Sequence, residues 1–264
     1  MPTSECQKSY ILILMVVLYL FIGAFLTIAT AQEISSEDKW GFLIEPYLMF
    51  PNMSGQTGFG NLPTIPVDAD PGDIFDKLQM GAMLYLEANN DKWAITSDFV
   101  YMNLQQDITP DKFIHSGTVT LNQTIWELAG LYRILPFLEA GVGGRLNYLE
   151  TDIDAQRIVL PAGTETITGH HSKTFYDPIL ITRLSTNIDN EWLFQFRGDF
   201  GGFGIGSDFT WQVQAYAGYR FTTLFQLSVG YRIISIDYDK GENEERFIFN
   251  MNEFGPAIRL GFNF

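Results

Sequence analysis

The 264-residue sequence predicts an all-β protein, built as a single closed antiparallel transmembrane barrel of about ten strands in meander order. Three observations lead to this prediction. Apolar and polar residues alternate with a period of two, short and long connections alternate along the chain, and arginine, but not lysine, lies inside the strands. A barrel of eight strands is the alternative, because strand ends are uncertain by two to four residues when a single sequence is interpreted.

Composition sets the outer limits on the fold and on the partners. The chain is 46% apolar and 15% aromatic, which excludes a disordered or low-complexity protein. Its net charge of −15 leaves no basic surface for phosphate groups, so we expect no nucleic-acid partner. The single cysteine, Cys6, lies near the start, so the rest of the chain has no thiol for a disulfide or for catalysis, and we expect no cofactor.

Residues 1–31 have the features of a signal peptide. Lys8 precedes an apolar run from Tyr10 to Ile28, and Ala29-Thr30-Ala31 provides small residues for cleavage before Gln32. We therefore expect residues 32–264 to form the barrel domain. The apolar run is long for a signal peptide, so an uncleaved membrane anchor is the alternative, and either interpretation exports the rest of the chain.

The strands follow from the alternation, taken in chain order. In residues 209–221, for example, Trp211, Val213 and Ala215 alternate with Gln212 and Gln214, which fits a strand and not a helix. No later stretch has the roughly 20 apolar residues that a membrane helix needs, so any further crossing must use strands. The predicted strands are about 40–50, 79–89, 93–104, 118–134, 137–151, 174–188, 192–202, 209–222, 225–238 and 247–264.

The connections between these strands form two classes. Tight turns near residues 89–92, 135–136, 189–191 and 223–224 alternate with longer links at 51–78, 105–117, 152–173, 203–208 and 239–246. Outer-membrane barrels have this asymmetry, with short turns on the periplasmic side and longer loops outside. We therefore predict a location in the outer membrane of a Gram-negative bacterium.

The placement of arginine distinguishes a membrane barrel from a soluble one. Strand arginines share the polar face with acids and with no lysine, as suits a crowded lumen in which the planar guanidinium bonds several acceptors. We expect a nearly neutral arginine–carboxylate network that fills the lumen and leaves no large pore. The predicted lumen residues are Glu45, Glu87, Asp98, Glu127, Arg133, Glu139, Arg145, Arg183, Arg197, Asp199, Arg220, Arg232, Asp237 and Arg259.

The C-terminal segment adds a more specific signal. Ile258, Leu260, Phe262 and Phe264 alternate with polar residues, so the chain ends on an aromatic residue in a lipid-facing strand. This end resembles the signature by which the barrel assembly machinery of Gram-negative bacteria recognises its substrates, and it implies that machinery as a partner through Phe264.

Three internal segments carry a wider resemblance. Residues 67–78, 197–211 and 230–238 resemble a family of small, largely uncharacterised outer-membrane β-barrel proteins. The resemblance implies the location and the architecture. It implies no activity, because the family has none agreed.

The long links hold the residues that invite a functional interpretation. Asp68, Asp70 and Asp73 imitate a calcium loop only in part. Residues 73–78 could form a helical turn, capped by Asp73, that plugs the barrel mouth. His115, His170 and His171 are all predicted in loops, where a pair such as His170 with Asp177 could act in acid–base chemistry, although no motif fixes a nucleophile.

These observations favour a structural or surface-interaction role over catalysis. A narrow channel for small solutes and an outer-leaflet enzyme that uses the loop histidines are the alternatives. The expected partners are membrane lipid and lipopolysaccharide, whose phosphates divalent cations could bridge to the acidic loops.

Overall fold

A computed structural model describes residues 40–264, apart from 61–63, 109–113, 160–162 and 190. The predicted signal peptide therefore lies outside the described residues. The elements in chain order are β1 (Gly41–Met49), β2 (Asn52–Phe59), β3 (Ile65–Ala69), α2 (Pro71–Lys77), β4 (Leu78–Asn89), β5 (Trp93–Asp107), β6 (Ile114–Leu135), β7 (Leu138–Val159), β8 (Gly163–Ile188), β9 (Trp192–Gly201), β10 (Phe209–Arg220), β11 (Phe225–Lys240), the 3-10 turn η1 (Asn243–Glu245) and β12 (Phe247–Asn263).

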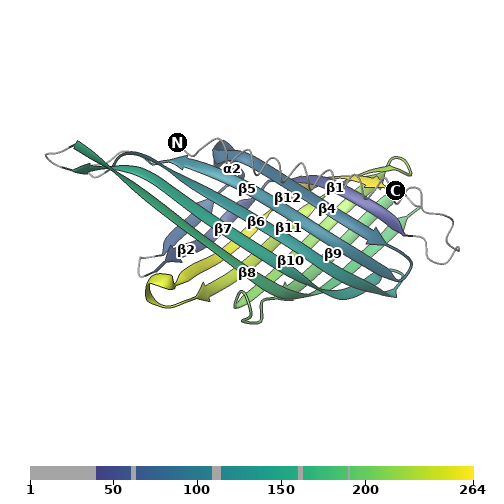
Figure 1. Cartoon of the computed structure of the whole chain (residues 1–264). Coiled ribbons are helices and arrows are strands. Elements are labelled where there is room, and N and C mark those ends of the chain that lie inside the picture. Colours follow the sequence, from purple (N-terminus) through teal and green to yellow (C-terminus); the bar gives the residue numbers. More distant parts are fainter. Residues whose placement is uncertain (1–39, 61–63, 109–113, 160–162, 190) are drawn as a thin grey trace, which may run out of the picture. The chain divides into compact units, whose positions relative to one another are not determined.

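Ten antiparallel strands close into a barrel. β1 pairs with β4 on one side and with β12 on the other, and β4 to β12 follow each other in chain order (Figure 1). This arrangement confirms the predicted meander and the count of ten strands. The tight turns join the strands at one end, where Trp93 and Trp192 are exposed, as aromatic residues are at a membrane boundary.

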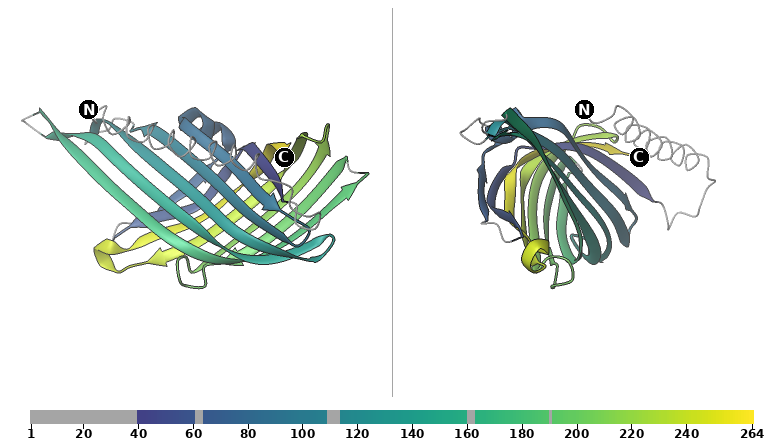
Figure 2. Two further views of the ribbon diagram at one scale, coloured as in Figure 1. Left: turned by 45° about the vertical axis from the view of Figure 1, so that its right-hand side comes forward. Right: turned by 60° about the vertical axis from the view of Figure 1, so that its left-hand side comes forward.

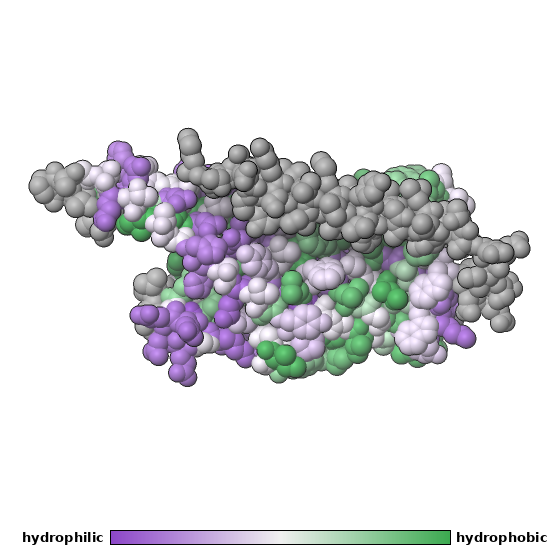
Figure 3. Space-filling view, in the orientation of Figure 1, coloured by the Kyte–Doolittle hydropathy of each residue, from purple (hydrophilic) through white to green (hydrophobic). Residues whose placement is uncertain are grey.

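The alternation in the sequence separates a lipid-facing wall from the lumen. Outward-facing Trp126, Val142 and Val229 are 47%, 63% and 53% exposed. Their sequence neighbours face inward, and Ile125, Glu127 and Ser228 among them are buried. Figure 3 shows apolar side chains on the wall and hydrophilic ones gathered at one end. Because every barrel strand pairs with a neighbour on each side, most backbone hydrogen bonds are satisfied within the wall, as lipid requires. The chain is therefore a transmembrane barrel of the outer membrane.

Three neighbouring strands are much longer than a membrane crossing. β6 and β7 have 22 residues each and β8 has 26, against 10 in β9. A crossing needs about 9–11 residues, so these strands project by about 35–50 Å along their length beyond the bilayer. Figure 2 shows the projection clearly. We call the part of β6–β8 beyond the bilayer the extension.

The prediction of loops at 105–117 and 152–173 is wrong, because strands β5 to β8 extend into both segments. β5 runs to Asp107 and β6 starts at Ile114, while β7 and β8 pair from Val159↔Gly163 downward. The physical reason is the residue type. The paired ends of β7 and β8 carry Ile153, Ile158, Thr164, Thr166, Ile167 and Thr168, whose branched Cβ favours extended backbone even where both faces meet water.

The first long link contains structure of its own. The β2–β3 hairpin continues the line of β1, because β2 pairs with β12. Helix α2 follows, and its cap is Asp70, not Asp73 as predicted. The Asp70 carboxylate accepts from the N–H of Asp73 at 2.9 Å, and Asp73 accepts from the N–H of Asp70, forming a capping box. Ile74 of α2 is 3% exposed and points into the barrel. Among the described residues, no helix is long and apolar enough to span a bilayer.

Candidate functional site

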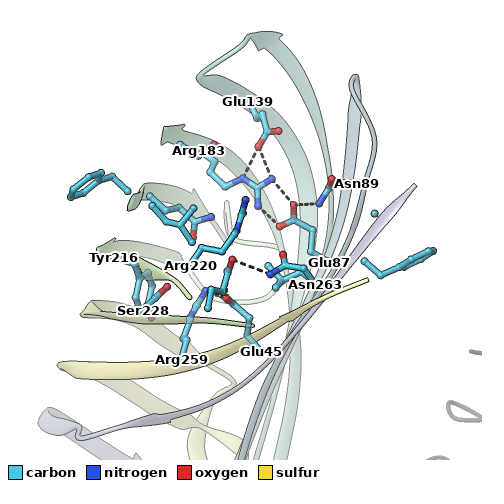
Figure 4. A pocket seen from close by; sticks show the side chains of 18 of the residues that line it. Glu45, Glu87, Asn89, Glu139, Arg183, Tyr216, Arg220, Ser228, Arg259 and Asn263 are labelled. Atoms are coloured by element: carbon cyan, nitrogen blue, oxygen red, sulfur yellow. Dashed lines mark hydrogen bonds and ion pairs between the residues drawn. The ribbon is translucent and has the colours of Figure 1, made fainter. Parts of the chain in front are cut away.

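The lumen has a polar pocket at the end where the tight turns lie. Its volume is about 360 Å³, and four arginines and three glutamates line it (Figure 4). Arg183 donates to Glu139 at 2.6 Å and to Glu87 at 2.5 Å, so one guanidinium joins β4, β7 and β8. The residues concerned are Glu45, Glu87, Arg133, Glu139, Arg183, Arg220 and Arg259.

A second group of charges lies further along the same strands and closes the lumen above the pocket. Arg145 is fully buried and donates to Glu127 at 2.8 Å and to Asp199 at 2.6 Å. Arg197 pairs with the same two carboxylates. Two guanidiniums and two carboxylates thus compensate each other where water is excluded, a geometry in which removal of one partner is costly.

Tyrosine hydroxyls extend the network on the opposite wall. Tyr47 donates to Asp98 at 2.7 Å and accepts from Arg232 at 2.7 Å, while Arg232 also pairs with Asp98 at 3.2 Å. Arg259 lies over the ring of Tyr216, with 4.0 Å from its Cζ to the ring centre, and pairs with Glu45. The guanidinium of Arg259 is thus held by charge on one side and by a π face on the other.

Glycine makes room for this packing at one strand. A Cβ at Gly230 would collide with the ring of Tyr216, the same ring that covers Arg259. The absence of a side chain at Gly230 thus leaves room for the large ring of Tyr216 on the polar face.

Twelve of the fourteen predicted lumen residues form these ion pairs. Arg220 is different: it points into the pocket, and its Nε is buried without a partner among the described residues (Figure 4). The prediction for Asp237 is wrong. It pairs in register with exposed Phe209 and is itself exposed, because odd-numbered residues of β11 face outward while Arg232 and Ile234 face inward.

Sequence reasoning missed the neutral members of the network. Tyr47 and Tyr85 face inward at the same parity as Glu45 and Glu87, and Gln212 bridges Arg232 to Asp199. The parity was visible in the sequence. The roles were not, because a tyrosine in a barrel strand is also a common lipid-facing residue at a membrane boundary.

The outer half of the lumen is mostly apolar, with the hydrogen-bonded pair of Gln123 and Glu253 at its inner border, and the prediction of a charged filling did not include this. On β11 the inward residues change from Arg232 to Ile234 and Ile236, which are each 2% exposed. Apolar residues on both faces, as in Ile233-Ile234, were the available signal. This outer cluster consists of Met53, Ile74, Met102, Ile125, Leu149, Phe175, Ile234, Ile236, Tyr238, Phe247, Phe249 and Met251.

The histidines lie in strands, not in loops as predicted. His115 is exposed on β6, and adjacent His170 and His171 of β8 point to opposite faces of the extension. His171 packs inward, with 4.2 Å between its ring centre and that of Phe59, while His170 is exposed. The suggested pair of His170 with Asp177 is wrong, because Asp177 faces the lumen, where Ser207 donates to it at 2.8 Å.

His170 instead pairs across the strands with Asp152. Its Nδ1 lies 2.6 Å from the Asp152 carboxylate, which raises the pKa of His170 above its ordinary value of 6.5. Glu150 lies 3.8 Å from the same nitrogen. The ligand atoms of Glu150, Asp152 and His170 all lie within 4.8 Å of one another, so the three residues could hold a divalent cation or act in proton transfer.

Comparison with known proteins supports the fold alone. No family model and no curated protein matches the sequence. The outer-membrane protease OmpT from Escherichia coli is similar in structure, with a TM-score of 0.55, 10% identity, and coverage of 88% of this chain and 99% of that one. The attachment invasion locus protein Ail of Yersinia pestis, crystallised with a heparin analogue, gives a TM-score of 0.37 at 8% identity. The match covers 85% of this chain and 98% of the Ail chain.

Proposed function

We propose that the protein is a surface-interaction protein of the outer membrane, in which the barrel is a sealed anchor and the extension is the working part. The observation that carries this proposal is the contrast between a filled lumen and three strands that continue far beyond the bilayer. Stabilising a long sheet in water serves no purpose in anchoring, and exposed segments on a rigid scaffold are where binding residues concentrate.

The lumen supports the proposal because it is closed by two different means. The buried pairs of Arg145 and Arg197 fill the middle, and the outer cluster fills the half next to the extension. Barrels of about eight strands are just filled by side chains, and ten strands with this content leave little room for diffusion. The described residues of the lumen thus leave no continuous polar path for small solutes, which argues against the alternative of a channel.

The extension offers a recognisable docking feature, the free edge of β8. β9 pairs with β8 only from Ile179 to Ile188, so the edge from Gly163 to about Phe175 faces no strand among the described residues. A free edge presents backbone donors and acceptors to any extended peptide. The partner class we propose is therefore an extended segment of another protein.

The test compares the full chain with a trimmed one. Replacing residues 152–170 by an Asn-Gly turn joins two strands that are already in register, since Asp152 pairs with His170. Cells displaying the full chain should bind protein-coated surfaces, and cells displaying the trimmed chain should not, while both proteins keep the heat-modifiable gel shift of a folded barrel.

Two outcomes would contradict the proposal. One is surface binding that survives trimming. The other is a stable opening of porin size when the purified full chain is placed in a planar bilayer, because the lumen would then not be sealed.

An enzyme is the second candidate, and the group of Glu150, Asp152 and His170 favours it. A histidine oriented by a carboxylate is suited to act as a general base, and the similar fold of OmpT belongs to a protease. Peptide or lipid hydrolysis that is lost in His170→Ala and kept in His115→Ala would support catalysis. Equal turnover in both variants, or none in the full chain, would remove it.

The remaining partners we propose follow from location. Membrane lipid surrounds the wall, divalent cations bridge the acidic loops to lipopolysaccharide phosphates, and the assembly machinery recognises the strand that ends at Phe264.

A further inference from the structure

The barrel wall is incomplete between β1 and β4. Their register runs from Gly41↔Asn89 to Pro46↔Leu84, and beyond this pair the described residues of the two strands form no ladder. We call the gap between Tyr47–Met49 and Gly81–Met83 the seam.

The two margins of the seam are held apart by their other neighbours. β12 pairs with β1 through Tyr47, Leu48 and Met49, and β5 pairs with β4 through Gly81 and Met83. Neither margin is frayed, so the seam is a built feature of the wall. Helix α2 closes its outer end, where Phe75 contacts Phe50 with 5.4 Å between ring centres.

The seam contains an apolar cavity of about 110 Å³. It extends from Leu48, which faces lipid and is 45% exposed, to inward-facing Met49 and Met83 and to Ile74 and Met102 of the outer cluster. A cavity of about 150 Å³ lined by leucine, isoleucine and phenylalanine stays dry and binds benzene. The cavity in the seam is thus suited to an apolar occupant and not to water.

The height of the seam identifies the source of that occupant. With a rise of about 3.3 Å per residue and a tilt of about 40°, Pro46 lies about 13 Å and Met49 about 20 Å above Gly41, within an apolar band about 25 Å tall. The seam thus opens to the outer half of the bilayer. Open strand edges are tolerated at this depth only when something covers them, and acyl chains of the outer leaflet are what the seam faces.

We propose that the seam is a lipid-binding site, which takes the end of one acyl chain of an outer-leaflet lipid through the wall and seats it against Met83 and the outer cluster. The site is independent of the surface role of the extension. It requires only that the wall is open at Tyr47–Met49 and that the lining is apolar.

The chain offers a matched pair of variants to fill the seam. A Cβ at Gly81 meets only ordinary contacts, at 3.6 Å from Leu78 and 3.8 Å from the Tyr101 carbonyl, so Gly81→Leu places its side chain in the cavity without strain. Gly130 has no atom within 4 Å of its Cβ position and pairs with lipid-facing Ile95, so Gly130→Leu adds the same side chain to the outer wall.

The experiment uses the full chain in nanodiscs whose phospholipid carries a diazirine on its acyl chain. After illumination, mass spectrometry locates the adducts. We expect adducts on lipid-facing Leu48 and Val229 in every protein. We also expect adducts on inward-facing Met83 in the wild type and in Gly130→Leu, and their loss in Gly81→Leu.

Three results would overturn the proposal. The first is a wild type labelled on Leu48 and Val229 but not on Met83. The second is labelling of Met83 that Gly81→Leu does not reduce. The third is an equal loss in both variants. The heat-modifiable gel shift confirms that each protein is folded, so failure of the site is distinguishable from failure of the barrel.

Discussion

The two halves of the lumen are built on the same strands from opposite chemistries. Near the tight turns, Arg145, Arg183 and Arg197 hold carboxylates from distant strands, whereas towards the extension Ile234, Phe249 and their neighbours pack without polar partners. Side chains obstruct the lumen in both halves. The inner half depends on every charge having its partner, while the outer half depends on volume, so the two should respond differently to substitution.

The largest effect is expected in the inner half. Glu127→Ala removes the carboxylate shared by Arg145 and Arg197, both of which are buried. Because two guanidiniums then lose a partner where water is excluded, the free energy of unfolding should fall by about 3–5 kcal/mol. Reversible urea unfolding in lipid vesicles, followed by tryptophan fluorescence, measures the change.

The matched control is Asp239→Asn, which breaks an exposed pair with Arg246 at 2.6 Å. It should leave stability unchanged within error, because water and salt screen exposed pairs. If Glu127→Ala costs no more than Asp239→Asn, the inner half does not depend on its charges and the comparison fails.

The outer half should show a graded response to volume. Ile234→Ala should lower the free energy of unfolding by about 2–5 kcal/mol and Ile234→Val by about 0.5–1.5 kcal/mol, because each removed methyl group leaves a void that the closed wall cannot collapse to fill. The same urea titration measures both. Equal stability of the two variants would show that this half is loosely packed.

The smallest expected effect is a difference in pKa between two adjacent histidines of the extension, which face different surroundings. Burial lowers the pKa of His171 at the edge of the outer cluster, whereas Asp152 raises the pKa of His170 on the opposite face. A pH titration followed by NMR should give two imidazole pKa values, that of His171 below 6.5 and that of His170 above it. Asp152→Asn should lower the pKa of His170 towards its ordinary value, with Glu150 still nearby, and should leave the pKa of His171 unchanged.

The sign of the effect on stability follows from the direction of the shift. The folded state binds the His170 proton more tightly than the unfolded state does, so the pair with Asp152 favours folding below pH 6.5, and this contribution is lost as pH rises through the raised pKa. If His170 titrates below His171, the pairing with Asp152 is absent in solution.

Much of the barrel could be predicted from the sequence because strand parity is a local property. Arg133, Arg183 and Arg259 were placed inward by counting residues along each strand. The same counting from inward-facing Arg232 puts Asp237 on the outer face, so its assignment to the lumen departed from the alternation of β11. The ends of β7 and β8 were also misjudged, because polar segments that carry β-branched residues, such as Ile153, Thr166 and Thr168, were taken for loops although these residues favour strands.

The candidate sites were less accessible to sequence reasoning. The pairing of His170 with Asp152 needs the register between β7 and β8, and the seam needs the register between β1 and β4. A register is set by the closure of the whole barrel and by the number of residues in each turn.

The strands, the lipid-facing wall and the inward arginines follow from the amino-acid pattern, because a period of two forces successive side chains onto opposite faces. The assembled barrel is needed to know which arginine meets which carboxylate, where the lumen changes from charged to apolar, and where the wall is left open. These depend on strands far apart in the chain, such as β1 and β12, meeting at one height in a closed sheet.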